Sequence, residues 1–110
     1  MTMKERVENI LGGFLEQNED YAIELYINNA VTNLRVGQVF ITMDWTVKTD
    51  DDKFKIKWDI NQDINFNEFS FVYEEILACY DETDEYDQQT VYVIFKNGME
   101  FIFECIGMQI

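Results

Sequence analysis

The chain has 110 residues, of which 47% are apolar and 15% aromatic, and it carries 22 acidic against eight basic residues. This length suits one domain with one hydrophobic core over residues 1–110, and the aromatic content argues against intrinsic disorder. A net charge of −14 repels nucleic acid and anionic membranes and attracts basic protein surfaces. We therefore expect no direct nucleic-acid binding, no membrane binding and a basic protein surface as partner.

The first predicted element is a helix from Met3 to about Gln17. Thr2 and Glu5 have the spacing of a capping box, and apolar side chains then recur at helical spacing. Gly12 and Gly13 each lower helix propensity by about 1 kcal/mol relative to alanine. We expect this glycine pair to permit close packing, with a bend as the alternative.

Alternation of apolar and polar side chains predicts the next elements. The alternation from Tyr21 to Ile27 predicts a strand with one solvent-facing side. Residues 31–36 fit either a short strand or a loop. Val39 to Val47 and Lys53 to Ile60 alternate on either side of a turn at residues 49–52, which predicts a hairpin. In its second strand the lysines should face solvent and the apolar residues the core: Lys53, Lys55 and Lys57 alternate with Phe54, Ile56 and Trp58.

The segment 65–80 carries apolar residues at helical spacing, and this predicts a second helix. Asn65 and Asn67 are plausible caps. The spaced residues are Phe69, Val72, Tyr73, Ile76, Leu77 and Tyr80. The aromatic content keeps a strand as the alternative.

Asn97-Gly98 predicts a two-residue turn between two final strands. This turn pairs Ile94 with Phe101 and Tyr92 with Phe103 on one face. The opposite face is apolar in the middle with an acidic rim, and either a helix or a partner should cover it. The predicted fold class is α+β: a single small domain in which an antiparallel sheet of two or more hairpins packs with two helices.

The residues needed for most enzyme chemistry are missing. The chain has no histidine, no phosphate-binding glycine loop and no calcium-loop pattern in its acidic clusters. Cys79 and Cys105 are too few for a disulfide framework, and we expect both to be buried thiols. We therefore predict no enzyme activity, no cofactor and no metal site, with a two-carboxylate hydrolase as a distant alternative. Without a signal sequence or a long apolar stretch, the expected location is cytoplasmic.

The charge distribution carries the functional prediction. Between Trp58 and Phe95 there are ten acidic residues and no lysine or arginine, and seven of the ten fall in Glu74 to Asp87. The candidate partner-binding residues are Glu74, Glu75, Asp81, Glu82, Asp84, Glu85, Tyr86 and Asp87. The alternative is that these acids only keep the chain soluble. Half of the bases, Lys48, Lys53, Lys55 and Lys57, lie on the first hairpin, so the molecule is polarised.

In size, charge and lack of catalytic residues, the chain resembles acidic inhibitors that present carboxylates where a nucleic acid would bind, such as phage anti-restriction and anti-CRISPR proteins. The resemblance extends to general character and transfers no residue. It implies a protein-binding inhibitor whose acidic face occupies a basic, nucleic-acid-binding groove on its target. The alternatives are a self-associating structural or adaptor domain, with a homodimer as one form, and a toxin-neutralising immunity protein.

Overall fold

A computed structural model describes the backbone of the chain except at residues 20, 30–31, 33, 42–44, 62–64 and 110. The described residues form one helix and two antiparallel sheets, which is an α+β fold. The helix runs without interruption through α1 (Met3–Val7), a π-helical turn (Glu8–Gly12) and α2 (Gly13–Gln17).

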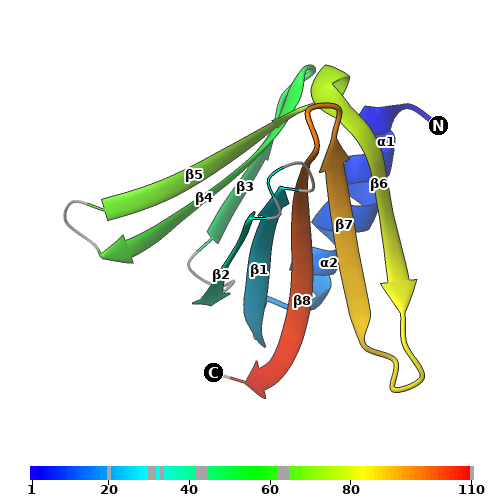
Figure 1. The fold of residues 1–110 in the computed structure, drawn as a ribbon. Helices are drawn as coiled ribbons and strands as arrows, with labels where there is room; N and C mark the ends of the chain where they lie inside the picture. Colours follow the sequence, from blue (N-terminus) through cyan, green and yellow to red (C-terminus); the bar gives the residue numbers. More distant parts are fainter. Residues whose placement is uncertain (20, 30–31, 33, 42–44, 62–64, 110) are drawn as a thin grey trace.

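One sheet has five strands in the order β2-β1-β8-β7-β6, and the other has three in the order β3-β4-β5. Figure 1 shows the smaller sheet splayed away from the larger one. The strands are β1 (Tyr21–Asn29), β2 (Leu34–Ile41), β3 (Trp45–Thr49), β4 (Lys53–Asn61), β5 (Asn65–Val72), β6 (Ile76–Thr83), β7 (Gln89–Phe95) and β8 (Met99–Gln109).

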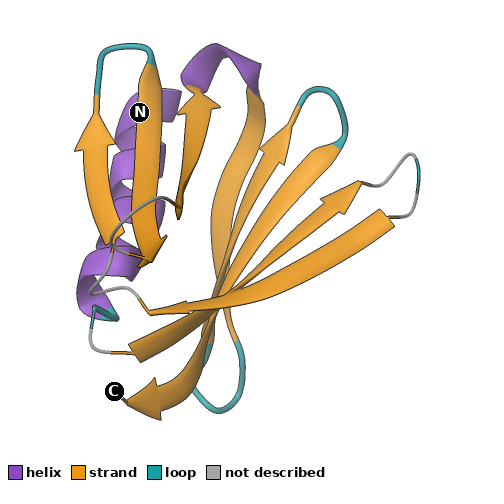
Figure 2. Ribbon diagram, turned by 90° about the vertical axis from the view of Figure 1, so that its left-hand side faces the viewer, coloured by secondary structure: helices purple, strands orange, loops and turns teal. Residues whose placement is uncertain are grey.

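The core lies where the helix and the inner faces of both sheets meet. Val7, Leu11 and Phe14 on the helix pack with Phe54 of the smaller sheet and Phe103 of the larger one, and each is at most 1% exposed. In Figure 1 the helix passes behind β7, and Figure 2 shows it along one side of the molecule. The helix therefore covers one face of the five-stranded sheet and leaves the other face open.

The predicted first helix is confirmed over its full length. The side chain of Thr2 caps it by accepting a hydrogen bond from the Glu5 amide at 3.2 Å. The expected close packing at its two glycines is not what the structure shows. A Cβ on Gly12 would lie 3.7 Å from Phe54, which is an ordinary contact, and a Cβ on Gly13 would meet nothing within 4 Å.

The predicted strand from Tyr21 is also confirmed, and the lysine-bearing hairpin is confirmed with a shorter first strand, since Trp45–Thr49 pairs with Lys53–Asn61. Phe54 and Ile56 are 1% and 0% exposed. On the opposite side Lys57 is exposed, whereas Lys53 and Lys55 are half-buried. The side chain of Trp58 lies outside the described residues. Residues 31–36, for which strand and loop were both considered, include the start of β2 at Leu34. Residues 39–41 belong to the same strand and pair with β1, not with the hairpin.

The predicted second helix is wrong. Residues 65–80 form β5, a 3₁₀ turn (Tyr73–Glu75) and most of β6. Along β5 the buried side chains alternate, and the 3₁₀ turn then shifts the phase before the chain enters β6. Two strands joined by such a corner imitate helical spacing, but Leu77 is 63% exposed and cannot belong to a helix stripe facing the core.

The predicted register of the last hairpin is displaced by one residue. Val91 lies opposite Phe103, and Val93 lies opposite Phe101. The loop has three residues instead of two, because Gly98 adopts a φ of 92° and its amide donates to the Phe95 carbonyl at 3.0 Å. A one-residue shift moves every side chain to the other face, so the buried face carries valines and phenylalanines while Tyr92 faces outward.

Candidate protein-binding surface

The structure divides the predicted acidic segment between two ends of β6. Glu74 and Glu75 lie on the 3₁₀ turn that precedes this strand, and the other six candidates lie at or beyond its far end: Asp81, Glu82, Asp84, Glu85, Tyr86 and Asp87. All eight side chains are exposed. An eight-residue strand spans about 26 Å at its usual rise, so one small partner group cannot contact both sets.

The far set forms a tightly bonded loop, which we call the acidic hairpin (Asp81–Asp87). One carboxylate oxygen of Asp84 accepts hydrogen bonds from the amides of Tyr86 and Gln88, both at 2.8 Å. The side chain of Gln88 donates to the Cys105 carbonyl at 2.8 Å and so ties the loop to β8. The acids of this loop are therefore presented in a defined arrangement, and Asp84 is committed to holding it.

A row of apolar and aromatic side chains crosses the open face of the five-stranded sheet. Strand pairing places Tyr26, Ile102, Tyr92 and Tyr80 next to one another on β1, β8, β7 and β6. The rings of Tyr80 and Tyr92 stack with centroids 4.9 Å apart and an interplanar angle of 17°. All four side chains are half-buried, so their ring and alkyl surfaces remain accessible. We call this side of the sheet the tyrosine face.

Carboxylates border the tyrosine face. Glu24 lies directly opposite Glu104, and Glu82 continues the same row beyond Thr90. Like charges directly opposite each other destabilise a sheet. Burial raises the pKa of Tyr92, and the nearby carboxylate of Glu82 adds to this increase by its charge and by a hydrogen bond. The tyrosine therefore stays protonated at neutral pH and serves as a donor to a carboxylate.

On the other side of the tyrosine row, Asn28 donates to Glu100 at 3.1 Å. Arg35 is in register with Asn28, and its side chain lies outside the described residues. The outward-facing side chains that are described on this sheet include no lysine or arginine. The tyrosine face and the acidic hairpin are continuous through β6, because Glu82 belongs to both.

These groups suit the recognition of arginine and lysine. Carboxylates accept charge-assisted hydrogen bonds from a guanidinium group, often as a bidentate pair. Tyrosine rings attract cations over their faces, and the planar guanidinium also stacks on them. Flat rings bordered by anions are likewise what a nucleic-acid strand offers through its bases and phosphates.

The outer side of the three-stranded sheet has the opposite charge. Lys48 lies opposite Lys55, which brings two like charges together across β3 and β4, and Lys57 lies opposite Glu68. Lys53 shares this side of β4. We call the four lysines Lys48, Lys53, Lys55 and Lys57 the lysine face. The two sheets thus carry opposite charges on their outer surfaces.

The two cysteines differ in exposure. Cys79 is 1% exposed, and Cys105 is half-buried, so the expectation of a buried thiol is confirmed for the first of them. Burial raises the pKa of Cys79 to about 11, Arg6 lowers it and Asp81 raises it. This thiol is protonated at neutral pH and is therefore a poor nucleophile.

Two buried polar atoms lie near the start of the helix. The Tyr73 hydroxyl and one carboxylate oxygen of Glu8 have no hydrogen-bond partner among the described residues. Tyr73 is 7% exposed. Burial raises its pKa from 10.0 to about 12, with further increases from the charges of Glu8, Asp50 and Asp52.

Sequence reasoning missed most of the tyrosine face. Glu24, Tyr26, Tyr92, Glu100 and Glu104 were not among the predicted partner-binding residues. An apolar centre with an acidic rim was visible in the final two strands, but the slipped register assigned Tyr92 to the core. The contribution of β1 depends on pairing with β8, such as Ile27 with Phe101, and no local pattern encodes it.

Comparison of the chain with protein-family models, with curated proteins and with solved structures found no match. Within the described residues, His, Cys, Asp and Glu form no group of three or more that could hold a metal ion. No helix in the same part of the chain has the length and hydropathy that crossing a bilayer would require.

Proposed function

We propose that this chain is an acidic inhibitor that binds a basic protein through its tyrosine face and acidic hairpin. The target would be a nucleic-acid-binding protein, and the chain would act by occupying the basic groove instead of the nucleic acid. The role is binding and not catalysis, and it needs no cofactor.

The observation that carries this proposal is the row in which Glu24 and Glu104 lie side by side next to stacked tyrosines. Repulsion between these carboxylates costs folding stability, and a cation placed over them offsets that cost. Solubility alone does not require such a pairing, because acids dispersed over the surface would serve equally well.

The first experiment tests the surface with a defined basic probe. We would measure binding of a fluorescent oligoarginine peptide to the whole chain and to the triple variant Glu24→Gln, Glu82→Gln, Glu104→Gln. Exposed ion pairs contribute about 0.2 to 1 kcal/mol each, so losing three should weaken binding by about 3- to 100-fold. The matched control is Asp52→Asn, Glu74→Gln, Glu75→Gln, which changes the net charge equally at another end of the molecule.

The control variant should bind almost as well as the unchanged protein. If both triple variants weaken binding equally, overall charge is sufficient and the tyrosine face has no specific role. Tyr92→Leu should weaken oligoarginine binding more than oligolysine binding, since guanidinium stacks on aromatic rings better than ammonium does.

The second experiment tests inhibition. The partner to test is one that binds the unchanged protein but does not bind the tyrosine-face variant. Adding the unchanged protein to this partner should displace labelled nucleic acid from it. A partner that keeps its nucleic acid at saturating chain would rule out action by charge mimicry.

The lysine face supports a second candidate function, self-association. The lysine face of one copy complements the tyrosine face of another, as an adaptor or structural domain would require. Such a contact joins two different surfaces, so it would build rings or open chains of copies. Light scattering after size exclusion should then show oligomers at low salt that Lys53→Glu, Lys55→Glu, Lys57→Glu abolishes. A monomer at both low and high salt removes this candidate.

A further inference from the structure

One border of the three-stranded sheet has no neighbouring strand among the described residues, and we call its residues 68–72 the β5 edge. The strand order places β5 at the border, where its described pairing is with β4. Figure 1 shows β5 running from the tip of the smaller sheet to the corner that leads into β6. The tyrosine face lies on the other sheet, so the β5 edge is independent of the proposed binding of a basic protein.

Alternate residues of β5 point their backbone groups out from this edge. The amide of Tyr73 donates to the Asp52 carbonyl at 2.9 Å, so these two residues form a hydrogen-bonded pair. Such pairs alternate along an antiparallel ladder, and the next residues that exchange hydrogen bonds with β4 are therefore Phe71 and Phe69. The N–H and C=O groups of the alternate residues face away from β4 and are open to an added strand: Glu68, Ser70 and Val72.

The β5 edge also adjoins an apolar cavity. The side chains of Glu68, Ser70 and Val72 are exposed, whereas Phe71 on the inner side is 1% exposed. A cavity of about 290 Å³ lies between β5 and the hairpin of β7 and β8, and its lining includes Phe71, Val72, Phe95, Met99 and Phe101. The edge therefore combines unused backbone hydrogen-bond groups with apolar surface, which is the combination that recognition by strand addition requires.

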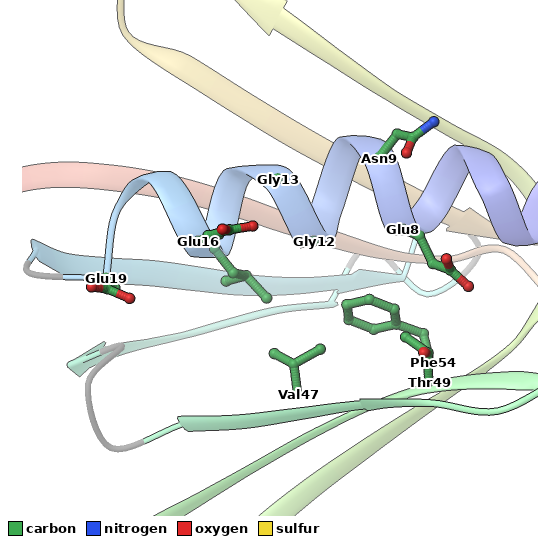
Figure 3. A pocket seen from close by; sticks show the side chains of 10 residues that line it. Glu8, Asn9, Gly12, Gly13, Glu16, Glu19, Val47, Thr49 and Phe54 are labelled. Carbon is green, nitrogen blue, oxygen red and sulfur yellow. The ribbon is translucent and has the colours of Figure 1, made fainter.

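The other border strands whose side chains are described carry features that discourage strand addition. β3 has five residues and carries Lys48, and in Figure 3 its Val47 points towards the helix. On β6, the helix residue Arg6 donates to the Cys79 carbonyl at 2.6 Å. β5 has eight residues, contains no lysine or proline, and carries Glu68 as its single charge. A long border strand without such features is a site for pairing with another strand.

A second copy of β5 is complementary to this edge. In an antiparallel pair centred on Ser70, this residue lies opposite itself, and Glu68 of each copy lies opposite Val72 of the other. On the inner side Phe69 of each copy lies opposite Phe71 of the other, so the two aromatic clusters meet. A register centred on Glu68 is disfavoured, because it would place two carboxylates directly opposite each other.

The charge around β5 also favours a second copy. The strands of this sheet carry four lysines and two acids, whereas those of the five-stranded sheet carry five acids and one arginine. Two copies of charge −14 therefore repel each other less through the smaller sheet. Lys53 lies beside Val72 on β4, so Glu68 of the second copy would approach a lysine.

We propose that two copies of this chain pair antiparallel through their β5 edges and form one continuous six-stranded sheet. The same surface is used by both copies, so the contact closes as a two-fold dimer. This distinguishes it from a contact between the lysine face and the tyrosine face, which joins two different surfaces.

Light scattering after size exclusion, at low and high salt, tests this proposal on the whole protein. Because both copies are strongly negative, salt screens their repulsion and the dimer should become tighter as salt rises. A contact between the lysine face and the tyrosine face would instead weaken. A monomer at high salt, or oligomers that dissociate as salt rises, would overturn the proposal.

Two substitutions at Ser70 test the edge itself. Ser70→Pro removes an outward-facing N–H, and proline is tolerated at a sheet border in such a position. Ser70→Lys places a lysine on the edge and makes the net charge less negative, so increased repulsion between whole molecules cannot explain a lost dimer. Thermal melts report whether both variants fold. The matched control is Thr46→Lys, which makes the same charge change on the exposed side of β3.

Each Ser70 variant should weaken dimerisation by about tenfold or more, because both copies lose an edge interaction at the centre of the pair. Thr46→Lys should change it by less than about twofold. A dimer that persists in both folded Ser70 variants, or equal losses in Ser70→Lys and Thr46→Lys, would show that the β5 edge is not the interface.

Amide hydrogen exchange locates the interface directly. The amides of Ser70 and Val72 should exchange rapidly in dilute protein and slowly in concentrated protein, since only the dimer protects them. The amide of Phe71, which is bonded to β4, should be protected at both concentrations and serves as the internal control. If exchange at Ser70 and Val72 does not depend on concentration, any dimer forms through another surface and the proposal is wrong.

Discussion

Substituting alanine for single glycines should change stability with a sign that depends on position. Gly13→Ala adds a methyl group that meets nothing within 4 Å. Alanine is better than glycine in a helix by about 1 kcal/mol, partly because glycine has more freedom in the unfolded chain. Gly12→Ala should gain a similar amount, since its Cβ would lie 3.7 Å from Phe54 without a clash.

The free energy of unfolding of the double variant should therefore be about 2 kcal/mol higher than that of the unchanged protein. This raises the melting temperature by about 8 °C for a domain of this size. Circular dichroism during heating and urea titration would measure both quantities. The urea dependence should keep its slope, because the surface exposed on unfolding hardly changes.

Two other glycines provide controls of opposite sign. A Cβ on Gly37 would lie 2.9 Å from Cδ1 of Tyr26, so the ring would have to move, and such overpacking costs about 1 to 3 kcal/mol. Gly98 has a φ of 92°, where alanine costs about 1 kcal/mol or more. If Gly13→Ala destabilises the protein as these controls do, the helix is packed more tightly at this position than the structure indicates.

Two further predictions concern buried or bonded polar groups. Tyr73→Phe removes a buried hydroxyl without a partner among the described residues, and it should stabilise the protein by about 1 kcal/mol at neutral pH in urea titration. Because the folded pKa of Tyr73 is raised from 10.0 to about 12, ionisation of this hydroxyl leaves stability unchanged below pH 10 and lowers it as the pH rises to about 12. Tyr73→Phe should therefore resist alkaline unfolding better than the unchanged protein, and equal pH curves would contradict the burial of this hydroxyl. Asp84→Ala should speed amide hydrogen exchange at Tyr86 and Gln88, whereas Asp84→Asn should protect both, because it keeps the oxygen that accepts at 2.8 Å. Equal exchange in the two variants would show that charge and not hydrogen bonding orders the loop.

Local patterns predicted the elements whose partners are close in sequence. The helix from Met3 has a cap and a stripe of apolar residues, and the hairpin of β3 and β4 has a short turn between alternating strands. Each of these signals is complete within about 15 residues, so no distant contact was needed to recognise it.

The errors arose where a local pattern was ambiguous or where pairing was distant. The corner at Tyr73–Glu75 changes the phase between two strands and gave residues 65–80 a helical appearance. A glycine at positive φ fits a two-residue turn and also ends a three-residue loop, and only packing decides which register forms.

The candidate site was predictable in charge but not in shape. The acid-rich sequence correctly indicated that Asp81 to Asp87 would be exposed. It could not indicate that Glu24 would lie beside Glu104, since these residues are brought together by the pairing of β1 with β8.

The pair Glu24 and Glu104 should affect folding and binding in opposite directions, and this distinguishes a binding surface from a solubility device. Removing one charge with Glu24→Gln relieves repulsion between directly opposed carboxylates, which should stabilise the free protein by about 0.2 to 1 kcal/mol at low salt. The gain should shrink as salt rises, because exposed charges are screened beyond about 10 Å at 0.1 M. The same substitution should weaken binding to oligoarginine, since it removes an acceptor. A residue whose replacement strengthens the fold and weakens the complex is one whose cost to the free protein is offset on binding. If Glu24→Gln instead destabilises the protein at low salt, the two carboxylates do not oppose each other and the tyrosine face loses the observation on which its proposed function depends.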